Sequence, residues 1–232
     1  MRIITNGFQN VAAVILNVAP VGVREWYKKT FELLFWRKHL YKVGEFRHAH
    51  MLRAFTEGFA LERSFFDGKH MLDIGCGPTG SLEWADTAAT RTGADPLADS
   101  YIKLNGGTHK MRYVNTGAED MPFGDGAFDV VSIFNALDHV EDVDAAIAEA
   151  LRVTKIGGSL LLIVEINHRA TITEPHSLKR DVIDKFEGCR VVLQNIYRTR
   201  DDHNMYASVF DALPLENDTD PGIIVAHLVK EQ

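Results

Sequence analysis

The stretch MLDIGCGPTG at residues 71–80 decides how the rest of the chain is interpreted. Its first half is an apolar run with the length of a buried strand. Gly75, Gly77 and Gly80 follow in Gly-x-Gly-x-x-Gly spacing, and a helix is predicted to start after them. Glycines behind a strand allow a tight turn whose backbone a ligand can approach closely. The spacing alone leaves a dinucleotide site open beside sites for other nucleoside cofactors.

Around this stretch, short β-rich runs alternate with helical runs from Gly68 onward. Strands are predicted in front of four helical stretches, at 81–89, 98–104, 142–155 and 177–186. This alternation predicts an α/β fold with a Rossmann-like, doubly wound sheet that is mostly parallel. The last two strand candidates, 189–197 and 222–231, have a loop-like stretch between them. They are predicted to form an antiparallel pair, so that the last strand of the sheet is antiparallel.

The composition is that of an ordinary globular protein with one enlarged domain, at 232 residues, 46% hydrophobic and 25% charged. Its two cysteines, Cys76 and Cys189, form no spaced pair, which excludes a disulfide framework or a zinc knuckle. That usage fits a reducing cytoplasm. The net charge of −7 argues against a nucleic-acid partner. We therefore expect a cytoplasmic protein that acts on a small molecule.

The first 66 residues differ from the rest in charge and in aromatic content. They hold ten Lys and Arg against five Asp and Glu, and 12 of the 22 aromatic side chains. Their aromatics recur at helical intervals, and Gly44 separates two predicted amphipathic helices. The apolar run at 11–23 is too short to cross a bilayer, which needs about 20 residues, and is interpreted as a buried or interfacial helix. We predict an N-terminal helical extension at 1–66 and a ligand-binding domain at 67–232, in one structural unit.

Two acids are candidates for binding the cofactor, and one of them favours S-adenosylmethionine over a nicotinamide dinucleotide. Asp73 lies two residues before Gly75, inside the end of the strand. A carboxylate there would attract the ammonium group of S-adenosylmethionine and repel a pyrophosphate. Asp95 ends the second predicted strand, where an acid can accept hydrogen bonds from both ribose hydroxyls. Asp95 fits either cofactor, so Asp73 carries the distinction.

Four motifs of this chain resemble, in order and spacing, those of the class I S-adenosylmethionine-dependent methyltransferases. They are LDIGCGPTG (72–80), GADP (93–96), GAEDMPFGDGAFDVVSIFNALDHVED (117–142) and LRVTKIGGSLLLI (151–163). The branch that they resemble includes the ubiquinone and menaquinone biosynthesis methyltransferases. The resemblance implies S-adenosylmethionine as cofactor, S-adenosylhomocysteine as product, and a methyl acceptor that it leaves open.

The resemblance also implies which residues bind the cofactor. The glycine turn would cradle its methionine and ribose portions through Asp73, Gly75, Cys76, Gly77 and Gly80. Asp95 would bind the ribose hydroxyls, and Pro96 and Leu97 would flank the adenine. Asn135, just past the fourth strand, would line the pocket under the methionine.

This chain departs from the family at two positions. At Gly117 the family usually has Asp or Asn, which reaches the adenine amino group. The backbone N–H of Ala118 can still serve the ring, and Glu119 or Asp120 is expected to replace the missing acceptor. Ile156 stands where a proline is usual, in a turn whose role is structural.

Three histidines are candidates for a catalytic base because they follow predicted strands, at the edge where open α/β sheets bind ligands. His139 follows the fourth strand, and His168 and His176 follow the fifth in a loop with Glu165 and Glu174. A hydroxyl acceptor needs a base for its proton, and histidine suits that role near neutral pH. We expect O-methylation of a sugar, a glycan precursor or a natural-product metabolite, ahead of methylation on nitrogen or carbon.

Asp138 and His139 are the only candidates for a metal site. In some quinone-pathway relatives a similar stretch, with Glu in place of Asn135 and Asp138, binds a divalent metal. Oxygen ligands would suit Mg²⁺, and a histidine makes room for a softer ion. We treat a metal as the less favoured alternative.

The N-terminal helices are expected to form a lid over the methyl group. These helices carry a group of cations: Arg24, Lys28, Lys29, Arg37, Lys38, Lys42 and Arg47. The cations indicate one of three things: an acceptor with a phosphate or carboxylate, a contact with an anionic membrane surface, or a solvated helix face. Three other functions stay open at this point. They are a peripheral-membrane methyltransferase of a lipid or quinone, a non-catalytic cofactor-binding scaffold, and a nicotinamide-dependent reductase.

Overall fold

The computed structural model describes residues 21–105 and 107–232. The apolar run at 11–23 therefore lies almost entirely outside the described residues. Within the two described ranges, no helix is both long enough and apolar enough to cross a membrane.

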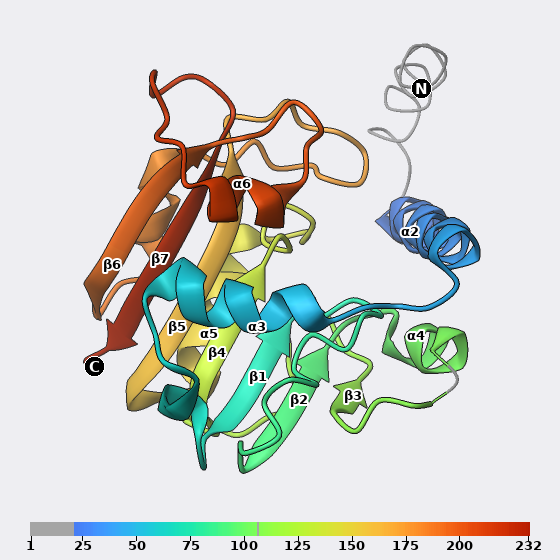
Figure 1. Cartoon of the computed structure of the whole chain (residues 1–232), viewed down its shortest axis with the longest axis horizontal. Helices are drawn as coiled ribbons and strands as arrows, with labels where there is room; N and C mark the ends of the chain where they lie inside the picture. The colour runs from blue at the N-terminus through green and yellow to red at the C-terminus, as the bar shows by residue number, and fades with distance from the viewer. Residues whose placement is uncertain (1–20, 106) are drawn as a thin grey trace.

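The centre of the molecule is a seven-stranded sheet with the order β3-β2-β1-β4-β5-β7-β6 (Figure 1). β1 to β5 run parallel to one another, and β7 is antiparallel to both β5 and β6. This confirms the predicted Rossmann-like, mostly parallel sheet with an antiparallel last strand. The strands are β1 His70–Ile74, β2 Thr90–Ala94, β3 Arg112–Val114, β4 Phe128–Phe134, β5 Thr154–Ile166, β6 Cys189–Arg198 and β7 Gly222–Lys230.

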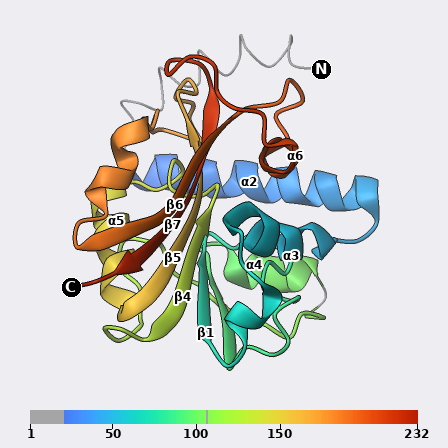
Figure 2. The same ribbon diagram turned by 60° about the vertical axis from the view of Figure 1, so that its left-hand side comes forward.

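Helices cover both faces of this sheet (Figure 2). α3 and α6 pack on one face, and α5 and the 3-10 helix η3 pack on the other. The helical elements are α2 Val21–Val43, α3 Ala49–Thr56, η1 Glu57–Phe59, η2 Arg63–Phe66, α4 Ala98–Leu104, α5 Val143–Val153, η3 Arg180–Lys185 and α6 Met205–Asp211.

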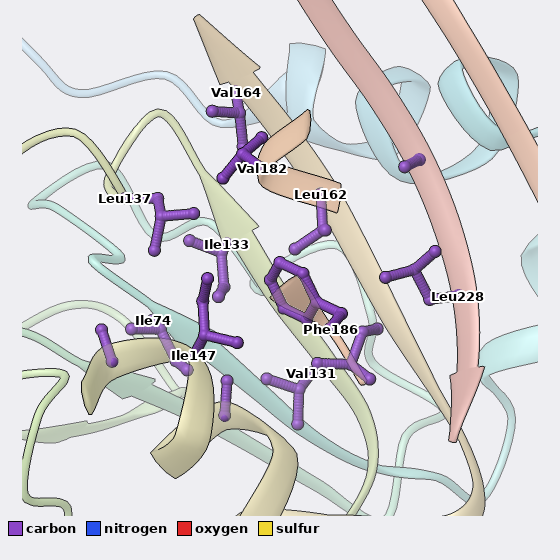
Figure 3. Close-up of a cluster of buried hydrophobic side chains, with 14 of the residues drawn as sticks. Ile74, Val131, Ile133, Leu137, Ile147, Leu162, Val164, Val182, Phe186 and Leu228 are labelled. Carbon is purple, nitrogen blue, oxygen red and sulfur yellow. The ribbon is translucent and has the colours of Figure 1, made fainter. Parts of the chain in front are cut away.

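The core is split into two layers because successive side chains of a strand point to opposite faces. In β5, Leu160 and Leu162 belong to the layer under α5, whereas Leu161 and Ile163 belong to the layer under α3. Figure 3 shows the first layer, where side chains of β4, β5 and β7 meet those of α5. A strand segment buried on both faces has to be apolar at every position, which explains the unbroken hydrophobic run at 160–164.

The helix predicted at 81–89 is wrong. The chain forms a series of turns from Gly75 to Thr87 instead. Gly80 has a left-handed φ of 75°, and the N–H of Glu83 donates to the Gly80 carbonyl over 3.0 Å, which closes a four-residue turn. Burial of Leu82 and Trp84 in the core under α3 fixes these turns. Within the described residues, no helix therefore begins directly after the glycine turn.

Two further elements differ from prediction. The stretch at 177–186 contains the 3-10 helix η3 where an α-helix was expected, and α6 forms inside the stretch between the last two strands that looked like a loop.

The N-terminal helices occupy two different positions. α2 and α3 flank Gly44, which has a φ of 78°, as the sequence predicts. α3 is part of the core, since the ring of Phe55 packs at a tilt against that of Phe134, with the ring centroids 4.6 Å apart. α2 instead crosses the edge of the sheet where the parallel strands end (Figure 2). The boundary at residue 66 stays a prediction.

Candidate functional site

The glycine turn after β1 is shaped by one close approach. The N–H of Gly75 donates to the carbonyl of Ala94 over 2.8 Å, which ties the turn to the end of β2. Gly75 has a φ of 72°, and a Cβ atom at this position would lie 2.3 Å from the Cβ of Ala136. The loop after β4 therefore passes so close to the turn that only glycine fits.

We expect Gly75→Ala to lower the free energy of unfolding by roughly 2 to 3 kcal/mol, from left-handed strain together with overpacking. Gly44→Ala is the matched control, because Gly44 has a φ of 78° and nothing within 4 Å of a Cβ. That variant should lose only about 1 kcal/mol from the strain. Urea unfolding measures both, and equal losses would contradict the close packing at Gly75.

Asp95 sits at the end of β2 and holds two backbone groups. Its carboxylate accepts the N–H of Leu97 over 2.8 Å and that of Gly77 over 3.2 Å. The side chain is buried, and this burial, together with the nearby Glu32 carboxylate, raises its pKa to about 7. Pro96 is exposed next to it, whereas Leu97 is buried. The two backbone hydrogen bonds therefore do not offset the cost of burying an ionised Asp95 carboxylate.

Asp73 is the second buried carboxylate of the site. It accepts a hydrogen bond of 2.6 Å from the hydroxyl of Ser132 on the neighbouring strand. Burial nevertheless raises its pKa to about 6. Cys76 lies beside the two acids, and burial and their negative charges raise the pKa of its thiol. Cys76 is therefore a packing group here and not a nucleophile.

Asn135 presents an unsatisfied oxygen at the end of β4. Its backbone is left-handed, with a φ of 51°, and its N–H donates to the carbonyl of Ile163 over 2.8 Å. Its side-chain Oδ1 is buried and has no hydrogen-bond partner among the described residues. A buried acceptor without a donor costs free energy, so this atom suits a ligand that donates.

The glycine at 117 leaves a space that Glu119 occupies. A Cβ at Gly117 would lie 2.9 Å from Oε2 of Glu119, and Oε1 accepts the N–H of Glu141 over 2.8 Å. Asp120 is exposed, and its carbonyl accepts a hydrogen bond from Thr116. Glu119 is thus the acid whose carboxylate lies where the family has an Asp or Asn side chain. The neighbouring Ala118 is half-buried.

One face of helix α2 contacts residues near the glycine turn and α4. Glu32 accepts a hydrogen bond of 3.0 Å from the hydroxyl of buried Tyr101. One turn further, Trp36 lies 3.7 Å from the position of a Cβ at Gly77 and donates its indole N–H to Glu32. Sequence analysis missed Glu32 and Tyr101, since neither belongs to a motif.

The same face of α2 reaches the other side of the edge. Lys28 donates to the carbonyl of His139 over 2.9 Å and forms an ion pair with Glu141. α2 therefore covers both the glycine turn after β1 and the loop after β4, which is the position expected of a lid.

The three predicted histidines gather around one buried acid, Asp138. Nε2 of His168 lies 3.3 Å from one carboxylate oxygen, and Nε2 of His139 lies 3.9 Å from the other. His176 donates its Nε2–H to the carbonyl of Val140 over 3.0 Å, which anchors the loop after β5. Oδ1 of Asp138 has no hydrogen-bond partner among the described residues.

The charges of this cluster are arranged around His168. The Asp138 carboxylate raises the pKa of His168 to about 9, so this ring is an imidazolium at neutral pH. Burial and the negative charges of Asp138 and Glu174 raise the pKa of Glu165. His168 is therefore the counter-ion of Asp138, while His139 keeps a partly exposed ring.

Comparison with known proteins agrees with this geometry. Residues 72–162 match the methyltransferase domain family. These residues are similar to the class I S-adenosylmethionine-dependent methyltransferases, as the four motifs predict. It is 36% identical over 113 residues to the ubiquinone/menaquinone biosynthesis C-methyltransferase UbiE of Shewanella halifaxensis, covering 47% of this chain and 40% of that protein.

Two further comparisons agree with this assignment. The chain is 32% identical over 124 residues to the ubiquinone biosynthesis O-methyltransferase of Sodalis glossinidius, covering 50% of each. The chain thus spans half or less of the length of both curated relatives. In fold it is similar to the geranyl diphosphate C-methyltransferase of Streptomyces coelicolor, with a TM-score of 0.53, 16% identity, and coverage of 69% of this chain and 70% of that one.

The cofactor of this domain family is S-adenosylmethionine, as the motifs predict. The residues of the methyltransferase domain fit it on chemical grounds. Two buried carboxylates, Asp73 and Asp95, and the unsatisfied oxygen of Asn135 are all acceptors. An ammonium group and two ribose hydroxyls are donors, whereas a pyrophosphate brings only negative charge to the same atoms.

The metal alternative finds little support in the methyltransferase domain. Among residues 21–105 and 107–232, no group of three or more His, Cys, Asp or Glu side chains comes together to hold a metal. Asp138 and His139 form only a pair, and Asp138 already faces the positive charge of His168.

Proposed function

We propose that this protein transfers a methyl group from S-adenosylmethionine to a small molecule. The observation that carries the proposal is the pair of buried carboxylates, Asp73 and Asp95, beside the glycine turn. A ligand that donates hydrogen bonds or brings positive charge would stabilise their ionised forms. When bound, the cofactor supplies a methyl group on a positively charged sulfur that is already an excellent leaving group. The protein then has to align the acceptor and exclude water.

In the proposed site, Asp95 accepts hydrogen bonds from the ribose hydroxyls, and Asp73 and Asn135 face the ammonium end. Ala118 contributes its backbone N–H to the adenine, and Glu119 accepts from the adenine amino group in place of a side chain at position 117. Trp36 of α2 covers Gly77 of the glycine turn.

Calorimetric titration with S-adenosylmethionine, S-adenosylhomocysteine and NADH tests the cofactor. We expect micromolar binding of the first two and none of NADH. Binding of NADH alone would overturn the proposal and favour a reductase. Binding of the first two, with no methylated product from a broad screen of acceptors, would favour a non-catalytic scaffold.

The acceptor in this proposal carries a hydroxyl group, and His139 removes its proton. Among residues 21–105 and 107–232, the ring of His139 has no hydrogen bond, and its ion-pair partner Asp138 lies 3.9 Å away. His168 is held as an imidazolium, and His176 donates to a backbone carbonyl. Catalytic hydrogen bonds are often long without a substrate, so the gap to Asp138 does not speak against this role.

Several acceptor classes are compatible with such a base. A sugar, a glycan precursor or a natural-product metabolite remains the proposal from the sequence, and the names of the relatives add quinols and phenols to the first screen. An anionic group on the acceptor could accept a hydrogen bond from Nε of Arg24. This atom is buried and has no hydrogen-bond partner among the described residues.

A further inference from the structure

Three side chains of helix α2 contact the domain. Lys28, Glu32 and Trp36 are spaced by four residues, so they share one face of the helix. All three contact the methyltransferase domain, at His139, Tyr101 and Gly77 respectively. The opposite face of α2 must therefore point away from the domain. In Figure 1, α2 is the outermost described helix on that side of the molecule.

That outward side carries large exposed apolar side chains next to the exposed cations Arg37 and Lys38. Trp26 is 67% exposed, Leu34 is 56% exposed and Tyr41 is 90% exposed. Val23 and Phe31 on the same helix are also exposed. An ordinary surface helix has the reverse arrangement, with its apolar face on the core. Large aromatic and aliphatic side chains gathered on one exposed helix mark an interaction surface.

The charge of α2 indicates what binds there. The helix holds six Lys and Arg against two Glu, a net charge of +4, on a protein with a net charge of −7. Both acids have partners, since Glu25 pairs with Lys29 and Glu32 accepts from Tyr101. Within the described part of the chain, the exposed cations Arg37, Lys38 and Lys42 form no ion pair.

We propose that α2 docks this protein on an anionic lipid surface, lying flat with Trp26, Leu34 and Tyr41 in the headgroup region. An interfacial helix combines aromatic and leucine side chains with Lys and Arg, and each cation adds attraction to anionic headgroups. A second copy of this chain would bury the same apolar side chains, but it would place one cationic helix against another. The inner face of the docked helix covers both sides of the active site, so the lid lies at the membrane surface.

Flotation of the full chain with vesicles tests this proposal. We expect binding to phosphatidylcholine vesicles that contain phosphatidylglycerol, weakened by salt and absent with phosphatidylcholine alone. Trp26→Ser combined with Leu34→Ser should weaken binding at least tenfold, roughly the effect of keeping one large apolar side chain in water. Ile156→Ser is the matched control, because Ile156 is 73% exposed but lies before the buried part of β5.

A charge variant separates the electrostatic contribution. Arg37→Glu with Lys38→Glu should weaken binding about tenfold or more. Lys110→Glu with Arg112→Glu makes the same change in net charge at exposed positions by the start of β3, at the end of the strands opposite to α2, and should have little effect. Circular dichroism and S-adenosylhomocysteine binding confirm that each variant is folded, and neither readout depends on methyl transfer. Absence of binding to anionic vesicles at low salt, or equal losses in the control pair, would overturn the proposal.

Two measurements exclude other occupants of this face. A cysteine in Leu34→Cys should react quickly with a polar maleimide in the absence of vesicles and slowly in their presence. Slow reaction without vesicles would mean that the chain itself covers α2, and would overturn the proposal. Sedimentation should find no dimer that Trp26→Ser with Leu34→Ser dissociates, and such a dimer would identify a second copy as the partner.

Discussion

Asp95→Asn is expected to weaken the binding of S-adenosylhomocysteine by about a hundredfold to a thousandfold at pH 8. Two hydrogen bonds from ribose hydroxyls to a charged carboxylate contribute about 1.5 to 3 kcal/mol each, and the neutral amide keeps only part of that. The change also disturbs the acceptor for the N–H groups of Gly77 and Leu97. Isothermal titration calorimetry measures the loss directly.

The pH dependence gives this prediction a second readout. The pKa of Asp95 is raised to about 7 in the free protein, and donors from the ligand favour its ionised form. The ligand must therefore displace a proton below that pH, so affinity rises with pH toward about 7 and levels off above it. Asp73, with its pKa raised to about 6, adds a weaker rise at lower pH. Asp95→Asn should abolish the upper part of the rise and keep the lower.

Asp99→Asn is the control for Asp95→Asn. Asp99 lies in the first turn of α4 and accepts a hydrogen bond from Asn115 at the surface. Its loss should leave the affinity and its pH dependence unchanged. If Asp95→Asn bound within threefold of the natural protein, the ribose would lie elsewhere.

The sequence predicts the position of Asp95 because that position depends only on local order. An acid at the end of a strand, next to the glycine turn in a parallel sheet, has to lie at the edge where ligands bind. The order of strands and the two apolar layers follow from the same alternation. The turns at 81–89 could not be predicted, since burial of Leu82 and Trp84 outweighs the helical propensity of that stretch.

The contacts of α2 were beyond sequence reasoning for a different reason. Glu32 meets Tyr101 across 69 positions of the chain, and no periodicity links two such residues. The sequence likewise does not distinguish the role of His139 from that of His168. They separate only when the buried carboxylate of Asp138 lies 3.3 Å from one ring and 3.9 Å from the other.

His139→Ala is expected to lower kcat by about a hundredfold to ten-thousandfold, the range for loss of a general base. Cofactor affinity should stay within about twofold, because the ring of His139 faces Asp138 and its contact with α2 is made by the backbone carbonyl. Turnover is measured as release of S-adenosylhomocysteine with an acceptor found by screening quinols, phenols and sugars. Added imidazole should restore part of the activity if the missing group is a base.

We expect substitution of the other two histidines to lower kcat less than His139→Ala does. His168→Ala leaves the buried carboxylate of Asp138 without its counter-ion, so it should lower both stability and turnover. His176→Ala removes a loop anchor and should raise KM more than it lowers kcat.

His70→Ala is the control, since His70 begins β1 at the opposite edge of the sheet and should keep full turnover. A variant of His168 that lost more kcat than His139→Ala, with imidazole rescue, would move the base to His168. Full turnover in His139→Ala would mean that the acceptor gives up no proton at this residue, as expected for methylation of carbon or nitrogen.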